Sequence, residues 1–106
     1  MDLRVSVRGV EKPEALRAFA EERAAKGLAR FDKKILGATM RLQDETGAER
    51  KGLDKTCSIE VKLRQGEVRI KEQGEDFVAT INAALDRLKA ALSRKVSRTK
   101  RGVAEG

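Results

Sequence analysis

Apolar and polar residues alternate along four short segments of the chain, and this alternation predicts strands. Near the start, one polar residue separates Leu3 from Val5 and another separates Val5 from Val7. A period of two places every second side chain on the same face, as in a strand that is buried on one side. The same alternation recurs in three later segments: residues 36–43, 56–64 and 67–72. Residues 44–55 are mostly polar and contain two glycines, so they predict a mobile loop.

Apolar residues at helical spacing define two further segments. Residues 13–30 form the first, and its opening proline is well tolerated at a first helical position. Asp76 is the expected N-cap of the second, because its carboxylate can accept backbone N–H groups of the first turn. This helix covers at least residues 77–94. Residues 96–106 contain few apolar side chains, so we expect a basic tail that frays or is disordered.

The predicted order of elements is β-α-β-β-β-α, which indicates one α+β domain over residues 1–95. Crossovers between parallel strands are right-handed, so the first two strands should pair in parallel within a four-stranded mixed sheet. Each helix has one apolar side, so both should pack on one sheet face, as in double-stranded-RNA-binding domains. The other face would expose seven basic side chains to water: Arg4, Arg8, Arg41, Lys62, Arg64, Arg69 and Lys71.

Positive charge is concentrated in the two predicted helical parts of the chain. The 106 residues include 24 Lys and Arg against 17 Asp and Glu, a net charge of +7. Residues 1–34 hold nine basic and six acidic side chains, and residues 77–106 hold seven and two. The segment between them holds eight and nine. This distribution indicates a polyanion-binding face, and the alternative is a basic protein whose charges are merely solvated.

Helical spacing gathers several of these cations into two stripes, because each residue advances a helix by about 100°. The first stripe is Arg23, Lys26 and Arg30, with Lys33 just past the end of that helix. The second stripe is Arg87 and Arg94, joined by Arg98 and Arg101 if the second helix extends that far. Two such ridges side by side would form a groove or flat face suited to phosphates. The chain has no Trp or Tyr, and its three Phe lie in predicted helices, so bases have no aromatic platform. We therefore expect contacts to RNA phosphates and shape.

No residue pattern indicates an enzyme, a cofactor or a metal site. The chain has no histidine, and Cys57 has inward parity in a predicted strand, which is typical of a structural thiol. Three acidic pairs have simpler explanations, namely divergent helix positions, a loop and a helix cap: Glu21-Glu22, Asp44-Glu45 and Glu75-Asp76. No apolar run is long enough to span a membrane, and the start lacks a secretory signal, so we expect a cytoplasmic protein.

With these elements in place, the sequence resembles the short form of the ribosome hibernation-promoting factor family. That family includes the ribosome-associated translation inhibitor also called protein Y. The stretch EALRAFAEERAAK at 14–26 looks like the first-helix signature, and EDFVATINAALDRLKAAL at 75–92 looks like the second. Departures include Pro13 at a usual Thr cap, Gly27 at a common core Leu and Val78 at a common Tyr.

The resemblance implies a ribosome-binding domain at residues 1–95. Family members occupy the small-subunit channel between head and body, cover the sites of messenger and transfer RNA, and stall translation reversibly in stress or stationary phase. Their basic helix residues meet ribosomal RNA. Stripes and resemblance together give the expected RNA-binding set: Arg23, Lys26, Arg30, Lys33, Arg87, Arg94, Lys95 and Arg98. The C-terminal domain by which long members pair ribosomes is not matched, so pairing through it is not implied.

The leading hypothesis is therefore a translation inhibitor whose partners are the small ribosomal subunit and its RNA. We expect a monomer when free, with no membrane and no small-molecule substrate. A general binder of structured or duplex RNA is the first alternative, since it needs the same charges. The second alternative is a protein-interaction modulator of transcription factors, which would use the exposed sheet face.

Overall fold

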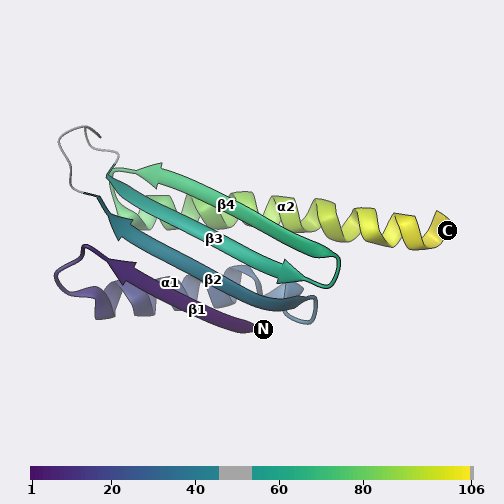
Figure 1. Cartoon of the computed structure of the whole chain (residues 1–106), viewed down its shortest axis with the longest axis horizontal. Coiled ribbons are helices and arrows are strands. Elements are labelled where there is room, and N and C mark those ends of the chain that lie inside the picture. The colour runs from purple at the N-terminus through teal and green to yellow at the C-terminus, as the bar shows by residue number, and fades with distance from the viewer. Residues whose placement is uncertain (46–53, 106) are drawn as a thin grey trace.

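The computed structural model describes residues 1–45 and 54–105, with side chains described as far as Val96. Four strands and two helices follow one another in the predicted order β-α-β-β-β-α (Figure 1). The elements are β1 (Asp2–Arg8), α1 (Pro13–Gly27), the short 3-10 helix η1 (Ala29–Phe31), β2 (Ile35–Asp44), β3 (Lys55–Leu63), β4 (Gly66–Gly74) and α2 (Phe77–Glu105). Residues 46–53, the centre of the predicted loop, lie outside the described residues.

The four strands form one sheet in the order β1-β2-β3-β4. β1 runs parallel to β2, and the other neighbours are antiparallel, which confirms the predicted mixed sheet. The register places Val5, Met40, Ile59 and Ile70 in one row across all four strands. Both helices cover the face to which this row points, so the α+β fold with helices on one side is also confirmed (Figure 1).

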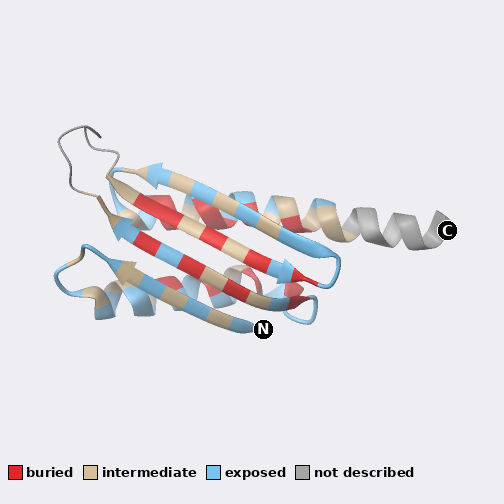
Figure 2. Cartoon of the chain, in the orientation of Figure 1, coloured by how far each residue is buried: buried red, intermediate tan, exposed pale blue. Residues whose placement is uncertain are grey.

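The core lies between the sheet and the helices, and it is densest along β2 and β3 (Figure 2). Met40 and Val61 from these strands and Leu88 and Leu92 from α2 are fully buried. Truncating a buried side chain of this size typically costs about 2–5 kcal/mol, so these residues fix the helices on the sheet. The edge strands β1 and β4 are only half-buried on their inner side.

α1 ends earlier than the sequence predicted, at Gly27 instead of near Arg30. Leu28 follows with its N–H donated to the carbonyl of Ala24, and η1 then turns the chain toward β2. Leu28 is fully buried and Phe31 is 6% exposed. Burying both side chains requires the chain to leave the helical path, so Arg30 lies on η1 instead of α1.

α2 begins where the sequence predicted, because Asp76 caps it. Asp76 Oδ1 accepts the Ala79 N–H at 2.8 Å, as an N-cap carboxylate does. The helix then continues to Glu105, beyond the predicted minimum at Arg94. Residues 96–105, for which the sequence predicted a frayed or disordered tail, are therefore helical in backbone. Fraying of this tail in solution stays a prediction.

Gly9 provides a direct test of the packing where β1 ends. Its φ is +75°, and a Cβ added there would lie 2.5 Å from the carbonyl oxygen of Asp44. We predict that Gly9→Ala lowers the free energy of unfolding by about 1–3 kcal/mol, since it adds left-handed strain and a backbone clash. Urea denaturation measures this. Gly27→Ala is the control, because its Cβ would meet only Leu85 Cδ1 at 4.0 Å; an equal loss in both variants would contradict the account.

Cys57 provides a second test, this time of core burial. The pKa of its thiol is raised to about 12. Burial is the larger cause, and the negative charge of Glu72 is the smaller one. We predict that the native protein resists iodoacetamide at mildly alkaline pH and reacts only when unfolded. The native state also holds this proton at higher pH than the free thiol, so the free energy of unfolding should fall as pH rises from about 9.0 toward 12. Mass spectrometry of the treated protein detects the iodoacetamide adduct on Cys57. Rapid labelling of the native protein would contradict burial of this thiol.

Candidate nucleic-acid interface

A groove runs between α1 and α2 on the side of the molecule away from the sheet. Two adjoining hollows form it, and both are lined by Lys26, Gly27 and Lys89. Gly27 leaves the space open, because it carries no side chain and Leu85 lies 4.0 Å from where its Cβ would be. The core beneath this point of the chain is filled by the next residue, Leu28, which is fully buried. We call this feature the helical groove.

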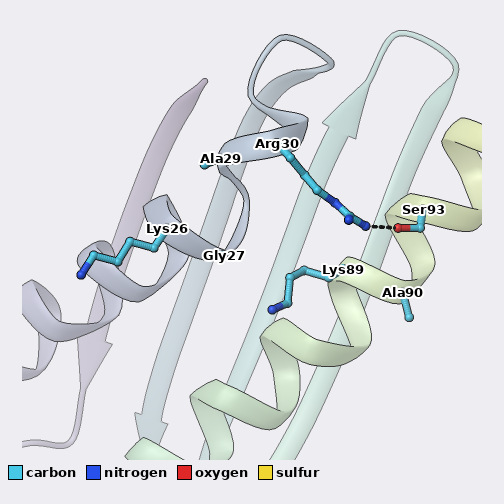
Figure 3. Close-up of a pocket in the computed structure, with 7 residues that line it drawn as sticks. All are labelled: Lys26, Gly27, Ala29, Arg30, Lys89, Ala90 and Ser93. Carbon is cyan, nitrogen blue, oxygen red and sulfur yellow. Dashed lines mark hydrogen bonds between the residues drawn. The ribbon is translucent and has the colours of Figure 1, made fainter.

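Four cations line the helical groove, from three different elements. Arg23 and Lys26 come from the last turns of α1, Arg30 from η1 and Lys89 from α2. Arg30 reaches across the groove toward α2, where its Nη2 donates a hydrogen bond of 2.5 Å to Ser93 Oγ (Figure 3). The groove thus presents guanidinium, ammonium and hydroxyl groups, which are the side-chain groups that contact nucleic-acid phosphates.

Two phenylalanine rings hold the arginines of this region in place. The Arg23 guanidinium carbon lies 5.2 Å from the centre of the Phe19 ring, and that of Arg30 lies 4.7 Å from the Phe31 ring. Cation–π contacts of this kind contribute about 0.5–1 kcal/mol at exposed sites. They orient the guanidinium groups without cancelling their charge, so both remain available to an anion.

The carboxylates near the groove are weak competitors for its lysines. Lys26 pairs with Glu22 at 3.0 Å, which lowers the pKa of Glu22, but both side chains are mostly exposed, at 75% and 67%. Lys89 lies 3.5 Å from Asp86. Surface pairs contribute about 0–1 kcal/mol, so phosphates could replace these partners at little cost. The four cations that line the groove outnumber these two carboxylates.

Arg87, predicted to belong to a basic stripe side by side with that of the first helix, does not line the helical groove. Its Nη1 donates to Glu72 Oε1 at 2.8 Å and to the Lys71 carbonyl at 3.3 Å, so the side chain lies against β4. Two residues further along α2, Lys89 lines the groove instead. A difference of two positions is about 200° around a helix, which puts the two side chains on opposite sides. The expected pairing of the two stripes is therefore wrong for Arg87, and its role in RNA binding stays a prediction.

The remaining residues of the predicted set are spread around the groove or lie beyond it. Lys95 Nζ lies 3.2 Å from where a Cβ of Gly66 would be, which places it beside the turn between β3 and β4. Arg94 is exposed on α2, and Lys33 is exposed in the turn after η1. The side chain of Arg98 lies outside the described residues. The structure thus brings together Arg23, Lys26 and Arg30, and adds Lys89, which the sequence interpretation missed.

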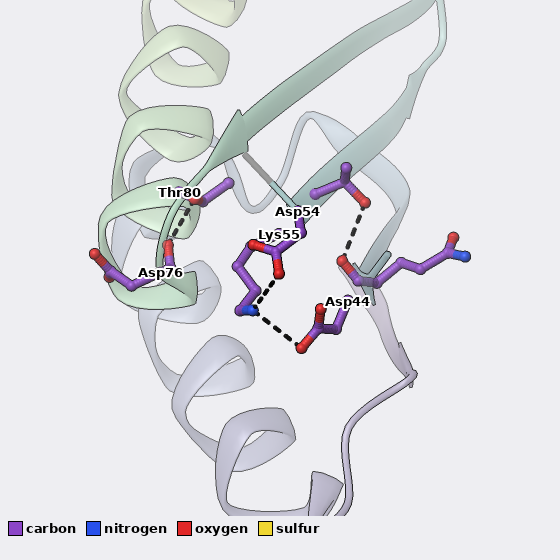
Figure 4. Close-up of polar contacts among 7 residues, drawn as sticks. Asp44, Asp54, Lys55, Asp76 and Thr80 are labelled. Carbon is purple, nitrogen blue, oxygen red and sulfur yellow. Dashed lines mark hydrogen bonds and ion pairs between the residues drawn. The ribbon is translucent and has the colours of Figure 1, made fainter. Parts of the chain in front are cut away.

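The acidic pairs at the other end of the sheet have structural partners. Asp44 is the last residue of β2, not a loop residue as predicted, because Lys55 of β3 pairs with it at 3.0 Å and with Asp54 at 3.1 Å (Figure 4). The pKa of Lys55 is raised, chiefly by its hydrogen bond to Asp44 and next by its hydrogen bond to Asp54. Next to this cluster, the Thr80 hydroxyl donates to the Asp76 carbonyl at 2.6 Å (Figure 4). These contacts stabilise the end of β2, the start of β3 and the start of α2.

Other kinds of site find little support in the part of the chain that the structure describes. No three His, Cys, Asp or Glu side chains there come together in a way that could hold a metal ion. Among the same residues, no helix combines the length and apolarity needed to cross a membrane.

Comparison with known proteins adds a family and a set of similar structures. The family model described as sigma 54 modulation protein / S30EA ribosomal protein matches residues 3–100. The protein Y N-terminal domain of Thermus thermophilus is similar at 27% sequence identity and a TM-score of 0.70, covering 89% of this chain and 98% of that one. A ribosomal subunit interface protein from Coxiella burnetii shares the fold at 22% identity and a TM-score of 0.71, with 92% and 99% covered. No curated protein sequence matches the chain.

Proposed function

The chain belongs to the sigma 54 modulation protein / S30EA ribosomal protein family, a family of ribosome-associated factors, and on that premise we propose that it binds the small ribosomal subunit and inhibits translation. Binding would occupy the channel that messenger and transfer RNA use, so that initiation is blocked while the protein stays bound. The resemblance seen in the two helix signatures points to the same mode of action.

The cationic lining of the helical groove is the observation that carries this proposal. Lys26, Arg30, Lys89 and Ser93 line one hollow, and the Ser93 hydroxyl on α2 accepts the hydrogen bond of Arg30 (Figure 3). Such a set of donors suits the phosphates of folded RNA, whose bases are turned inward and whose backbone is exposed. Phe31 is buried, and Phe19 and Phe77 pack against the core, so base stacking has no part in the proposed contact.

Inhibition by occupancy requires no chemistry and is reversible. Phosphate contacts release counterions from RNA, so the affinity should be high at low salt and fall steeply as salt rises. The rigid body that fills the channel would be the sheet with its two helices. We assign binding to residues 1–95 and treat residues 96–106 as a basic tail that adds to the attraction.

The remaining features of the proposal follow from the family and from charge. We propose a cytoplasmic protein that is monomeric when free and acts in ribosome hibernation during stress or stationary phase. Ribosomal RNA would be the direct partner. The rest of the predicted RNA-binding set would lie around the groove as secondary contacts: Lys33, Arg87, Arg94, Lys95 and Arg98.

We predict that removing two charges from the groove weakens subunit binding without loosening the fold. The groove variant carries Lys26→Gln and Lys89→Gln. Its affinity for purified small ribosomal subunits should fall about tenfold, and the slope of log affinity against log salt should shrink by about two. Co-sedimentation over a series of salt concentrations measures both. Thermal unfolding should change little, since both lysines are solvent-accessible.

The matched control carries Lys12→Gln and Arg17→Gln, which removes the same charge from exposed positions outside the groove. It should bind almost as the wild type does. Equal weakening of control and groove variant would mean that only net charge matters and would contradict the groove. Migration of the wild-type protein apart from the subunits would overturn the whole proposal, and equally tight binding to duplex RNA would favour a general RNA binder.

We also predict that the wild-type protein reduces synthesis in a cell-free translation reaction. The physical reason is competition, so inhibition should depend on the ratio of protein to ribosomes and should be relieved at higher salt. The groove variant should require about ten times more protein for the same inhibition. Undiminished synthesis at saturating wild-type protein would contradict inhibition by occupancy, even if binding were retained.

A further inference from the structure

The sheet face opposite the helices carries a second set of cations. All seven basic side chains that the sequence predicted on this face are exposed: Arg4, Arg8, Arg41, Lys62, Arg64, Arg69 and Lys71. Neither helix covers this face, and the helical groove lies on the other side of the molecule (Figure 1). The cations of this sheet face therefore cannot line the helical groove, and a ligand that they bind would be bound at a separate site.

The carboxylates on this face are gathered in one part of it. Arg69 pairs with Glu60 at 3.3 Å and with Glu67 at 2.9 Å. Glu67 is also opposite Lys62 in the register of β3 and β4. Charge in this part of the face, toward the turn between β3 and β4, is therefore largely balanced internally.

The next row across the sheet has a different composition. The register aligns Ser6 of β1, Arg41 of β2, Ser58 of β3 and Lys71 of β4. We call these four residues the cationic row. It contains no carboxylate, and within residues 1–45 and 54–96 neither Arg41 nor Lys71 forms a side-chain ion pair. A hollow in the sheet surface is lined by Arg41, Ser58 and Lys71, and at its other side by Glu60 and Arg69, which pair with each other.

Cations and hydroxyls that alternate on neighbouring strands match the chemistry of a phosphate backbone. Arg41 and Lys71 are two strands apart, which is roughly 10 Å in a sheet. Arginine, lysine and serine are all common donors to phosphate oxygens. The centre of a protein–protein interface is usually more apolar than the rest of the surface. The large apolar side chains exposed in the described residues are Met1, Leu36 and Val78, and none of them belongs to the row.

We propose that the cationic row is a second RNA-binding site, which takes the phosphate backbone of an RNA segment different from the one in the helical groove. The Cα atoms span only 17 Å along the shortest axis of the molecule, so its two broad faces lie close together and RNA could contact both at once. The domain would then be held between two RNA surfaces. This inference rests on the proposed binding to the small ribosomal subunit and adds a second contact to it.

The test compares a row variant, Arg41→Gln with Lys71→Gln, with the charge-matched control Lys12→Gln with Arg17→Gln. We expect the row variant to bind small ribosomal subunits about tenfold more weakly, with a salt slope smaller by about two. The control should bind as the wild type does. If the wild type binds and the row variant binds equally well, the second site is overturned while the proposed function stands. If the wild type does not bind, both are overturned.

A cross-linking experiment identifies what each face contacts. Gln73→Cys places a thiol on the exposed face two residues from Lys71, and Ala90→Cys places one beside the groove. Buried Cys57 should remain unlabelled by a thiol-reactive photo-crosslinker. We expect both variants to cross-link to ribosomal RNA, at different segments. Cross-links from the Gln73→Cys variant to ribosomal protein alone, or none from it while the Ala90→Cys variant reacts with RNA, would overturn the second RNA site.

Discussion

Burial of the inner face of β2 and β3 under two helices is the constraint on which the rest of this structure depends. Met40, Leu42, Ile59 and Val61 are almost fully excluded from water, and only the apolar sides of α1 and α2 can cover them. Once those sides are used, the helices must lie next to each other with their polar sides outward. The same burial turns every second residue of the strands to the open face. The positions of the charges follow from the packing of the core.

Most of the fold could be predicted because local pattern and global packing agree in this chain. Alternation located all four strands, and the chemistry of Asp76 located the start of α2. The end of α1 could not be predicted, because it depends on the burial of Leu28 and Phe31 against residues distant in sequence. A helical pattern extends through Arg30, but the chain leaves the helix to fill the core.

The site was predictable only in part, for a related reason. Periodicity tells which side chains share a face of a helix, but it does not tell what that face meets. Arg23 and Lys26 share a side of α1 and line the groove, whereas Arg87 pairs with Glu72 on β4, a partner that only the packing of α2 on the sheet reveals. Lys89 was missed, although its spacing of four from Leu85 puts it near the side that faces α1.

The central claim is that cations brought together by this packing bind RNA phosphates. An electron cryo-microscopy structure of the protein bound to the small ribosomal subunit would test it most directly. The account predicts ribosomal RNA backbone within hydrogen-bond distance of Lys26, Arg30 and Lys89 in the helical groove. A complex in which the groove is open to solvent, or in which it meets only ribosomal protein, would contradict the account.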